Sequence, residues 1–436
     1  MSIIQKSVAA VALSGIAVAV SSAYAAGFQL AEMSAANQGR AMAGVGVVGD
    51  DLSALHYNAA GMTLLPGTRV QMTGSYVAVN AEFEGVNGET ENGRKKGQLL
   101  PAGYFTHQVN DQWWVGLAMT VPYGMGTDYE REWVGADKGN KSMILTVDIN
   151  PNVAWKMNDY VSFGAGLSLQ YARATLGKSV QSGMVNAIVK GDSWAWGWNV
   201  GVMIQPVETV RVGLSYRSHI SHNAEGDTSF ALTSQAKNTM EYLPETMKQA
   251  LALINGKTAD MDVRIKTPDT ITLSATWEAT PELRISGTAR WSKWSNFRVL
   301  NIENTFNTGM GAMVDAALNA NGSTPVENNW EDTWFVSLGA DYKLNNQWTV
   351  RGGVAFDKDP IADQTKRMAV IPDTNRLWLA LGASYKHCDN VTFDFGATYI
   401  KGIGDSDLYH DDQPEPFGDY KSLDSYIVAA SMQYRF

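Results

Sequence analysis

The stretch SYIVAASMQYRF, residues 425–436, alternates between apolar and polar side chains along most of its length. One face carries Tyr426, Val428, Ala430, Met432, Tyr434 and Phe436. The other face carries Ser425, Ser431, Gln433 and Arg435. A period of two places successive side chains on opposite sides of a β-strand. One apolar and one mostly polar face therefore predict a strand that lies between two different solvents.

The same period recurs along the chain, for example in residues 283–291 and 391–399. It predicts fourteen strands, near residues 68–83, 98–108, 113–126, 142–157, 160–176, 193–206, 209–222, 262–279, 283–299, 331–344, 347–357, 375–387, 391–403 and 422–436. An even number of strands with this alternation is typical of an outer-membrane barrel. The predicted fold class is all-β, a 14-stranded antiparallel transmembrane β-barrel.

The connections between these strands alternate in length. Tight turns are predicted at residues 110–111, 158–159, 207–208, 280–281, 345–346 and 389–390, with longer loops between them. Aromatic side chains beside the tight turns predict one interfacial girdle, made of Trp113, Trp114, Tyr160, Trp348, Tyr434 and Phe436. Closure follows because an open sheet would leave unpaired edge groups in hydrocarbon. A soluble sandwich or propeller is the alternative, and the turn asymmetry disfavours it.

The first 25 residues predict a secretory signal peptide. They contain Lys6, an apolar run over residues 8–20 and the small-residue site Ala23-Tyr24-Ala25. A helix needs about 20 apolar residues to cross a bilayer, which is more than this run provides. The mature chain has no later apolar stretch of that length. We therefore expect export to the outer membrane of a Gram-negative bacterium.

Composition and motifs exclude several other kinds of protein. The net charge of -10 argues against nucleic acid as a partner, and the single cysteine, Cys388, excludes an intramolecular disulfide. Gly44, Gly46 and Gly49 match a dinucleotide fingerprint, but no strand precedes them and no βαβ unit follows. The acidic run over residues 405–412 lacks EF-hand spacing. No cofactor and no metal are expected.

Residues 26–67, called here the N-terminal segment, do not alternate. They are rich in Ala, Gly and Met and have helical patterns around residues 32–43 and 52–60. A fourteen-stranded barrel has a lumen wider than its own side chains fill, so we expect this segment to plug it. A disordered tail is the alternative, which the low charge disfavours. The predicted domains are a signal peptide (1–25), this plug (26–67) and the barrel (68–436).

Seven short stretches resemble the FadL-type long-chain fatty acid transporters, a family that also includes porins for aromatic hydrocarbons. They are Ala26-Gly27-Phe28-Gln29-Leu30, Gly39-Arg40-Ala41, Asn58-Ala59-Ala60-Gly61-Met62, Pro122-Tyr123-Gly124, Tyr171-Ala172-Arg173-Ala174, Trp196-Gly197-Trp198-Asn199 and Ile371-Pro372-Asp373. The resemblance implies a barrel with an N-terminal hatch, an apolar pocket inside, and a lateral opening at a kink in the third strand. It also implies a monomer, because the lateral exit must face lipid.

By this resemblance, the lateral-opening kink lies at Pro122, Tyr123 and Gly124. The residues support a kink independently, because Pro122 cannot donate to a strand ladder and Gly124 and Gly126 weaken pairing. A surface bulge without a function is the alternative.

The resemblance also places a gate in the hatch, at Phe28, Asn58, Ala59 and Ala60. The family has an Asn-Pro-Ala motif facing the kink, whereas this chain has Asn58-Ala59-Ala60 and lacks the proline. Because proline fixes the local backbone angle, its absence leaves the gating detail open.

A fatty acid needs a cation for its carboxylate in a dry pocket. The resemblance assigns this role to Lys178, a few positions after Tyr171-Ala172-Arg173-Ala174, while an ordinary loop lysine is the alternative. A second basic residue of the family comes from the loop before strand ten. Residues 323–329 hold no Lys or Arg, which gives weight to a neutral hydrocarbon as substrate.

Apolar residues on the outer loops suggest a capture groove. The resemblance offers five candidates for it: Met184, Val185, Met247, Leu251 and Ile254. Packing of the loops against each other is the alternative.

These observations together predict passive transport of long-chain fatty acids, with a channel for monoaromatic or alkane hydrocarbons as the alternative. The sequence lacks a recognisable Ser-His-Asp set and G-x-S-x-G, so no enzyme is expected. An adhesin or a general porin would have a polar, open lumen. The expected partners are the hydrophobic substrate, outer-membrane lipid and, through the terminal aromatic Phe436, the barrel-insertion machinery.

Overall fold

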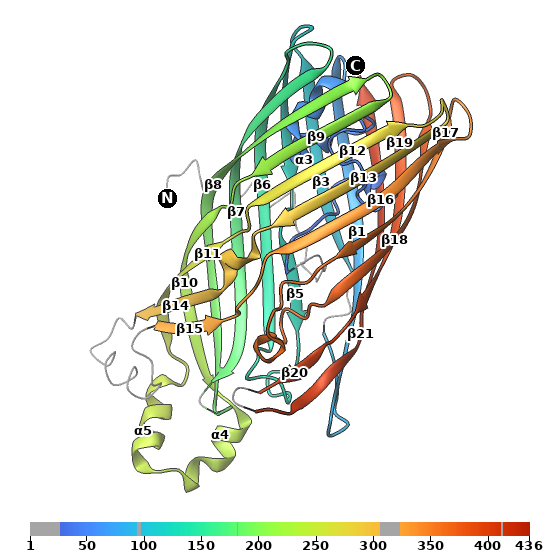
Figure 1. The fold of residues 1–436 in the computed structure, drawn as a ribbon. Coiled ribbons are helices and arrows are strands. Elements are labelled where there is room, and N and C mark those ends of the chain that lie inside the picture. Colours follow the sequence, from blue (N-terminus) through green and yellow to red (C-terminus); the bar gives the residue numbers. More distant parts are fainter. Residues whose placement is uncertain (1–26, 94–96, 181, 306–322, 411–412) are drawn as a thin grey trace.

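The computed structural model describes residues 27–93, 97–180, 182–305, 323–410 and 413–436. The predicted signal peptide, residues 1–25, lies outside the described residues. Within the described ranges, the chain forms one closed antiparallel barrel (Figure 1). Closure joins the first strand, β1 (Thr68–Gly85), to the last, β21 (Pro416–Arg435), in a ladder that runs from Arg69–Arg435 to Gly85–Gly418.

Fourteen strands build the wall, as predicted, and several of them are interrupted. In chain order after β1 they are β3 (Gln98–Gln108), β4 with β5 (Trp113–Thr120, Gly124–Asp128), β6 (Lys141–Lys156), β7 (Val161–Val180), β8 (Val185–Val207), β9 with β10 (Val210–Arg217, Ser221–Leu232), β11 with β12 (Thr258–Lys266, Thr270–Glu278), β13 with β14 (Leu283–Ser292, Val299–Thr305), β15 with β16 (Ser323–Glu327, Thr333–Lys343), β17 (Trp348–Asp357), β18 (Asn375–Lys386), β19 (Val391–Ile403) and β21. Two short strands, β2 (Thr90–Asn92) and β20 (Asp407–Tyr409), pair antiparallel with the last residues of β1 and the first residues of β21.

The two faces of the wall meet different surroundings. Large apolar side chains point outward and are exposed, such as Trp196 (73%) and Leu381 (71%). In β21 the outward face includes Tyr426 and Val428, whereas Ser431 is buried on the inner face. This pattern confirms the predicted alternation, because the outer face suits hydrocarbon and the inner face suits a packed lumen.

Two predictions made at the ends of strands are wrong. Trp114 is 3% exposed and its indole donates to the carbonyl of Leu65 at 3.1 Å, so it lies inside and not in the girdle. Its neighbour Trp113 points outward instead, because successive residues of a strand alternate. The ladder between β7 and β8 continues to Val180–Val185, so Lys178 and residues 185–189 belong to strands and not to a loop.

Short helices lie between the strands, and those after β10 are at the end of the barrel with the long connections (Figure 1). They are α4 (Ser234–Thr239), η2 (Met240–Tyr242) and α5 (Glu245–Ile254) after β10, η3 (Trp294–Phe297) between β13 and β14, and η4 (Gln364–Lys366) after β17. Among the helices of the described residues, none is both long enough and apolar enough to span a membrane.

Residues 27–66 of the N-terminal segment lie within the barrel and are largely buried. They form α2 (Ala35–Gln38), α3 (Ala54–Tyr57) and η1 (Ala59–Leu64), which contact the inner faces of β19, β4 and β6 to β8. The guanidinium of Arg40 pairs with Asp50 at 2.6 Å and with Asp341 of β16 at 3.1 Å. The pair with Asp341 fixes the segment to the wall, because breaking it would leave an uncompensated buried charge.

Glycines on the inner face allow the N-terminal segment to approach the wall. A Cβ atom at Gly164 of β7 would overlap the backbone of Ala59 and Ala60, and one at Gly353 of β17 would overlap the backbone of Arg40. The backbone of the segment therefore packs directly against the backbone of the wall at these positions.

We expect Gly164→Leu to loosen this packing while the barrel still forms, at a cost of about 1–3 kcal/mol from overpacking. The matched control is Gly103→Leu, because no atom lies within 4 Å of a Cβ at Gly103. The measurement is the temperature at which the folded band disappears on a gel of unboiled protein. A lower temperature for Gly164→Leu than for Gly103→Leu is expected, and equal temperatures would show that the contact is dispensable.

Candidate functional site

The third strand is interrupted beside a break in the wall. β4 ends at Thr120 and β5 begins at Gly124, with Pro122 between them. β3 pairs with β1 over Gln98–His107, but with β4 only over Gly103–Gln108. Among the described residues, no strand pairing joins residues 98–102 of β3 to β5. The kink predicted at this position is thus accompanied by a missing stretch of ladder.

The N-terminal segment pairs with the interrupted strand from inside the barrel. The amide of Leu30 donates to the carbonyl of Pro122 at 2.8 Å, and the amide of Gly124 donates to the carbonyl of Phe28 at 3.0 Å. Gln29 and Tyr123 stand opposite each other in this antiparallel bridge. The segment thereby satisfies backbone groups that the interrupted strand leaves without a ladder partner.

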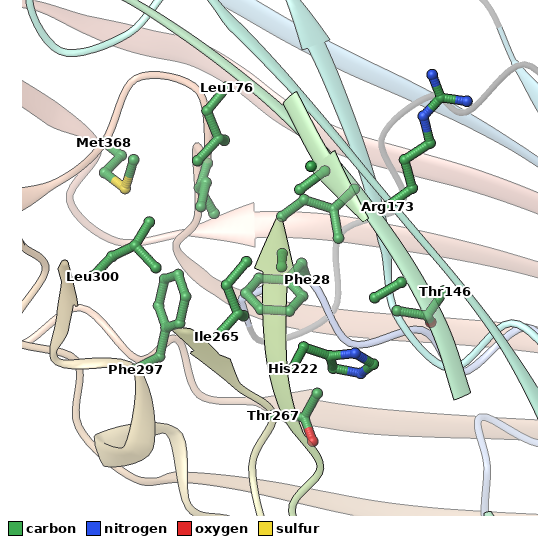
Figure 2. A pocket seen from close by; sticks show the side chains of 16 residues that line it. Phe28, Thr146, Arg173, Leu176, His222, Ile265, Thr267, Phe297, Leu300 and Met368 are labelled. Carbon is green, nitrogen blue, oxygen red and sulfur yellow. The ribbon is translucent and has the colours of Figure 1, made fainter. Parts of the chain in front are cut away.

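An apolar pocket lies directly beside Phe28 (Figure 2). Its lining comes from strands β6, β7, β8, β10, β11 and β14, from η3 and from the connection after β17. The larger apolar side chains that line it are Phe28, Ile144, Leu176, Ile265, Phe297, Leu300, Met368 and Ile371. The ring of Phe28 packs edge-on against Trp294 at 4.8 Å and Phe297 at 5.4 Å between ring centroids. Such a lining binds an alkyl chain or a ring through apolar contact.

Lys178 lies beyond this pocket, on the same face of β7. Ala174 and Leu176 line the pocket, and the period of two places Lys178 on their side of the strand. The side chain is half-buried and forms no ion pair or hydrogen bond with another described residue. The ammonium group is thus available at the outer end of the apolar lining.

The five candidates for the capture groove lie together, but in a closed cluster. Val185, Leu251 and Ile254 are at most 2% exposed, and Met184 and Met247 pack against them. Phe230 and Ala259 complete this cluster, which joins α5 to the ends of β8, β10 and β11. The described residues therefore form a packed cluster at this position, in which Val185, Leu251 and Ile254 are closed to solvent.

The helix η1 begins in the Asn58-Ala59-Ala60 stretch, which contains no proline. The side chain of Asn58 accepts a hydrogen bond from the amide of Ala60 at 3.1 Å, which caps the helix. Its amide group also donates to the carbonyl of Val202 at 3.0 Å. Asn58 shares a pocket with Pro122, whereas Ala59 and Ala60 pack against β7. The cap and the wall contact hold the turn that a proline would otherwise stiffen.

That second pocket lies beside the kink and is polar. Its lining includes Gln29 and Leu30 of the N-terminal segment, Pro122 and Tyr123 of the kink, and also His56, Tyr57, Asn58, Arg217 and Arg290. Arg290 lies in the alternating stretch 283–291, but alternation assigns no role to it, to His56 or to Arg217. Only their inward orientation marks these residues, and alternation does not show which inward positions face a pocket.

The beginning of the N-terminal segment is bonded to the connection after β17. The amide of Gly27 donates to the carboxylate of Asp373 at 2.7 Å, and Arg376 lies 3.0 Å from the same carboxylate. Burial raises the pKa of Asp373 to about 7, against the opposing effect of Arg376. This contact holds Phe28 at the base of the apolar pocket. No group of three or more His, Cys, Asp or Glu residues suited to a metal is found within the described ranges.

Comparisons with known proteins agree with this architecture. A family model described as "Outer membrane protein transport protein (OMPP1/FadL/TodX)" matches residues 16–436. The long-chain fatty acid transport protein of Escherichia coli O6:H1 is 26% identical, over 89% of this chain and 91% of its own length. Outer membrane protein P1 of Haemophilus influenzae is 27% identical, over 93% and 91% respectively.

Solved structures show the same fold. A FadL homologue of Pseudomonas aeruginosa superposes with a TM-score of 0.80 at 22% identity, covering 94% of this chain and 100% of its own. The toluene transporter TbuX of Ralstonia pickettii gives 0.68 at 16% identity, covering 93% and 99%. The family match confirms the predicted outer-membrane location and the prediction of a transporter and not an enzyme. Because the family model spans nearly the whole chain, this protein belongs to the OMPP1/FadL/TodX family of outer-membrane transport proteins.

Proposed function

We propose that this protein carries long-chain fatty acids passively across the outer membrane, from an apolar pocket in the barrel to a lateral exit at the kink of the third strand. The observation that carries the proposal is the position of Phe28–Leu30. Phe28 lines the apolar pocket, while Gln29 and Leu30 line the polar pocket at the kink. These three residues separate the two pockets, so their displacement would join them.

The energies of opening and binding are compatible with a ligand-driven gate. Releasing the segment breaks two backbone hydrogen bonds, worth about 0.5–1.5 kcal/mol each, and exposes Phe28, worth about 1.5–3 kcal/mol. An alkyl chain gains about 0.8 kcal/mol for each buried methylene group. A chain of roughly ten or more methylene groups therefore gains more than the release costs. Long chains suit this gate better than short ones.

The outer surface beside the break supports a lateral exit. Leu99 of β3 and Met119 of β4 point outward there and are 56% and 38% exposed. Both lie on the apolar face of the wall, so a chain that passes the break would meet hydrocarbon and not water. The N-terminal segment would act as the hatch, and a monomer would leave this face free for lipid.

Capture at the outer loops is the first step of the proposed route. The cluster of Met184, Val185, Met247, Leu251 and Ile254 is closed, so a ligand would have to insert between α5 and the strand ends. On the way inward, the ammonium group of Lys178, which forms no ion pair with another described residue, would hold the carboxylate.

A channel for neutral hydrocarbons is the alternative. It is supported by the apolar lining of the pocket and by the structural likeness to a protein titled as a toluene transporter. A neutral substrate would make no use of the cation at Lys178.

Uptake of radiolabelled oleate and toluene, measured side by side in cells without their own transporter, tests the substrate. We expect oleate uptake by the native protein and a loss of about ten-fold in Lys178→Ala, since a charge-assisted hydrogen bond contributes about 1.5–3 kcal/mol. Toluene uptake should not respond to this change. Lys190→Ala is the control, because Lys190 is exposed on the outer face. Toluene uptake alone would favour the hydrocarbon alternative, and uptake of neither would refute both.

A disulfide across the bridge tests the gate. Opposed residues of this bridge type have Cα atoms about 4.5 Å apart, which a disulfide can span. In a Cys388→Ser background, Gln29→Cys with Tyr123→Cys should abolish oleate uptake when oxidised, and dithiothreitol should restore it. Each single cysteine variant serves as a control. Full uptake by the oxidised double variant would show that the segment need not move away from the kink.

A further inference from the structure

Arg290 lies in the polar pocket without an anionic partner. It is 7% exposed, its Nε is buried without a hydrogen-bond acceptor, and no ion pair joins it to another described residue. Its guanidinium carbon lies 4.9 Å from the ring centroid of Phe335. Ser292, two residues further on the same face, donates to Gln29 at 3.3 Å, which shows that this face points toward the N-terminal segment.

The other charges near this pocket leave it cationic. Arg217 is paired, at 3.3 Å, with the carboxylate of Asp148 and also donates to the carbonyl of His56 at 2.9 Å. His56 lines the pocket with a buried Nδ1 that has no partner. Burial lowers the pKa of His56, and Arg217 and Arg290 lower it further, so the imidazole adds a neutral polar group.

Glu32 of the N-terminal segment is a carboxylate on which the charge of Arg290 acts. Its carboxylate accepts from the amide of Ala31 at 2.7 Å, and Glu32 does not line the polar pocket. Burial raises the pKa of Glu32 to about 7, which leaves the carboxyl group partly neutral at that pH. Glu32 forms no hydrogen bond or ion pair with Arg290 among the described residues, so the guanidinium has no direct contact with this carboxylate.

An uncompensated cation in a buried pocket is costly, and a ligand carboxylate relieves that cost. We infer that Arg290 binds the carboxylate of the ligand between the apolar pocket and the lateral exit, and we call this binding position the carboxylate station. The route then selects chains with an anionic head over neutral hydrocarbons. This inference rests on the proposed function and names its substrate class. Lys178 and Arg290 would then hold the carboxylate in turn, one on each side of Phe28.

The variant that tests the charge of Arg290 most directly leaves Arg290 itself unchanged. Thr272 of β12 stands directly opposite Arg290 in the ladder and also lines the polar pocket. Opposed residues have Cβ atoms about 4.5–5.5 Å apart, so Thr272→Asp would supply the missing carboxylate from the protein itself. Thr272→Asn has nearly the same shape without the charge and is the matched control.

The experiment compares initial uptake of radiolabelled oleate and oleyl alcohol, which share a chain and differ in the head group. We expect Arg290→Gln and Thr272→Asp to lower oleate uptake roughly ten-fold or more while oleyl alcohol uptake stays within about two-fold. Arg290→Lys, Thr272→Asn and Arg264→Gln should retain oleate uptake, the last because Arg264 is exposed on the outer face. Gel mobility of unboiled samples checks that each barrel is folded.

The possible outcomes separate this inference from the proposed function. If the native protein takes up oleate but Thr272→Asp and Arg290→Gln do so equally well, the carboxylate station is refuted and the fatty acid route stands. An equal loss of oleate and oleyl alcohol would also refute it, since a packing role has no preference for charge. A native protein that takes up no oleate would refute the proposed function itself.

Discussion

Backbone hydrogen bonding at the interrupted third strand is the constraint on which the rest of this structure depends. In hydrocarbon each amide and carbonyl needs a partner, which is why fourteen strands close into a barrel. Pro122 breaks the ladder at a level where the outer face is apolar, and Phe28–Leu30 bond to the edge that remains. The three residues that pair with the interrupted strand therefore belong to the segment that plugs the lumen.

This double role couples the interior of the barrel to its wall. Phe28 packs among the rings of Trp294 and Phe297, so anything that displaces it from the apolar pocket also strains the two hydrogen bonds at the kink. The remainder of the N-terminal segment is held differently, by the ion pair of Arg40 with Asp341 of β16 and by the glycine contacts with the wall. A local movement at the start of the segment is much less costly than release of the whole plug.

Much of the fold follows from alternation, because lipid on one side and a packed lumen on the other leave a period of two in the sequence. That signal weakens where the lipid ends, and so the predicted strands 160–176 and 193–206 stop short of the outer parts of β7 and β8. Trp114 shows a related limit, since two adjacent aromatics cannot both face the interface. The kink was predictable because proline and glycine act locally.

The polar pocket could not be predicted from alternation or from local proline and glycine signals, because its residues come from segments far apart in the chain. Arg290 has the same alternation signature as Ser286 and Thr288, and only the fold places it beside Gln29 and the kink. The order of the two pockets has a chemical consequence. In the proposed route, a fatty acid would pass from an apolar lining that recognises its chain to Arg290, which would recognise its carboxylate, so chain and head group would be recognised at different points.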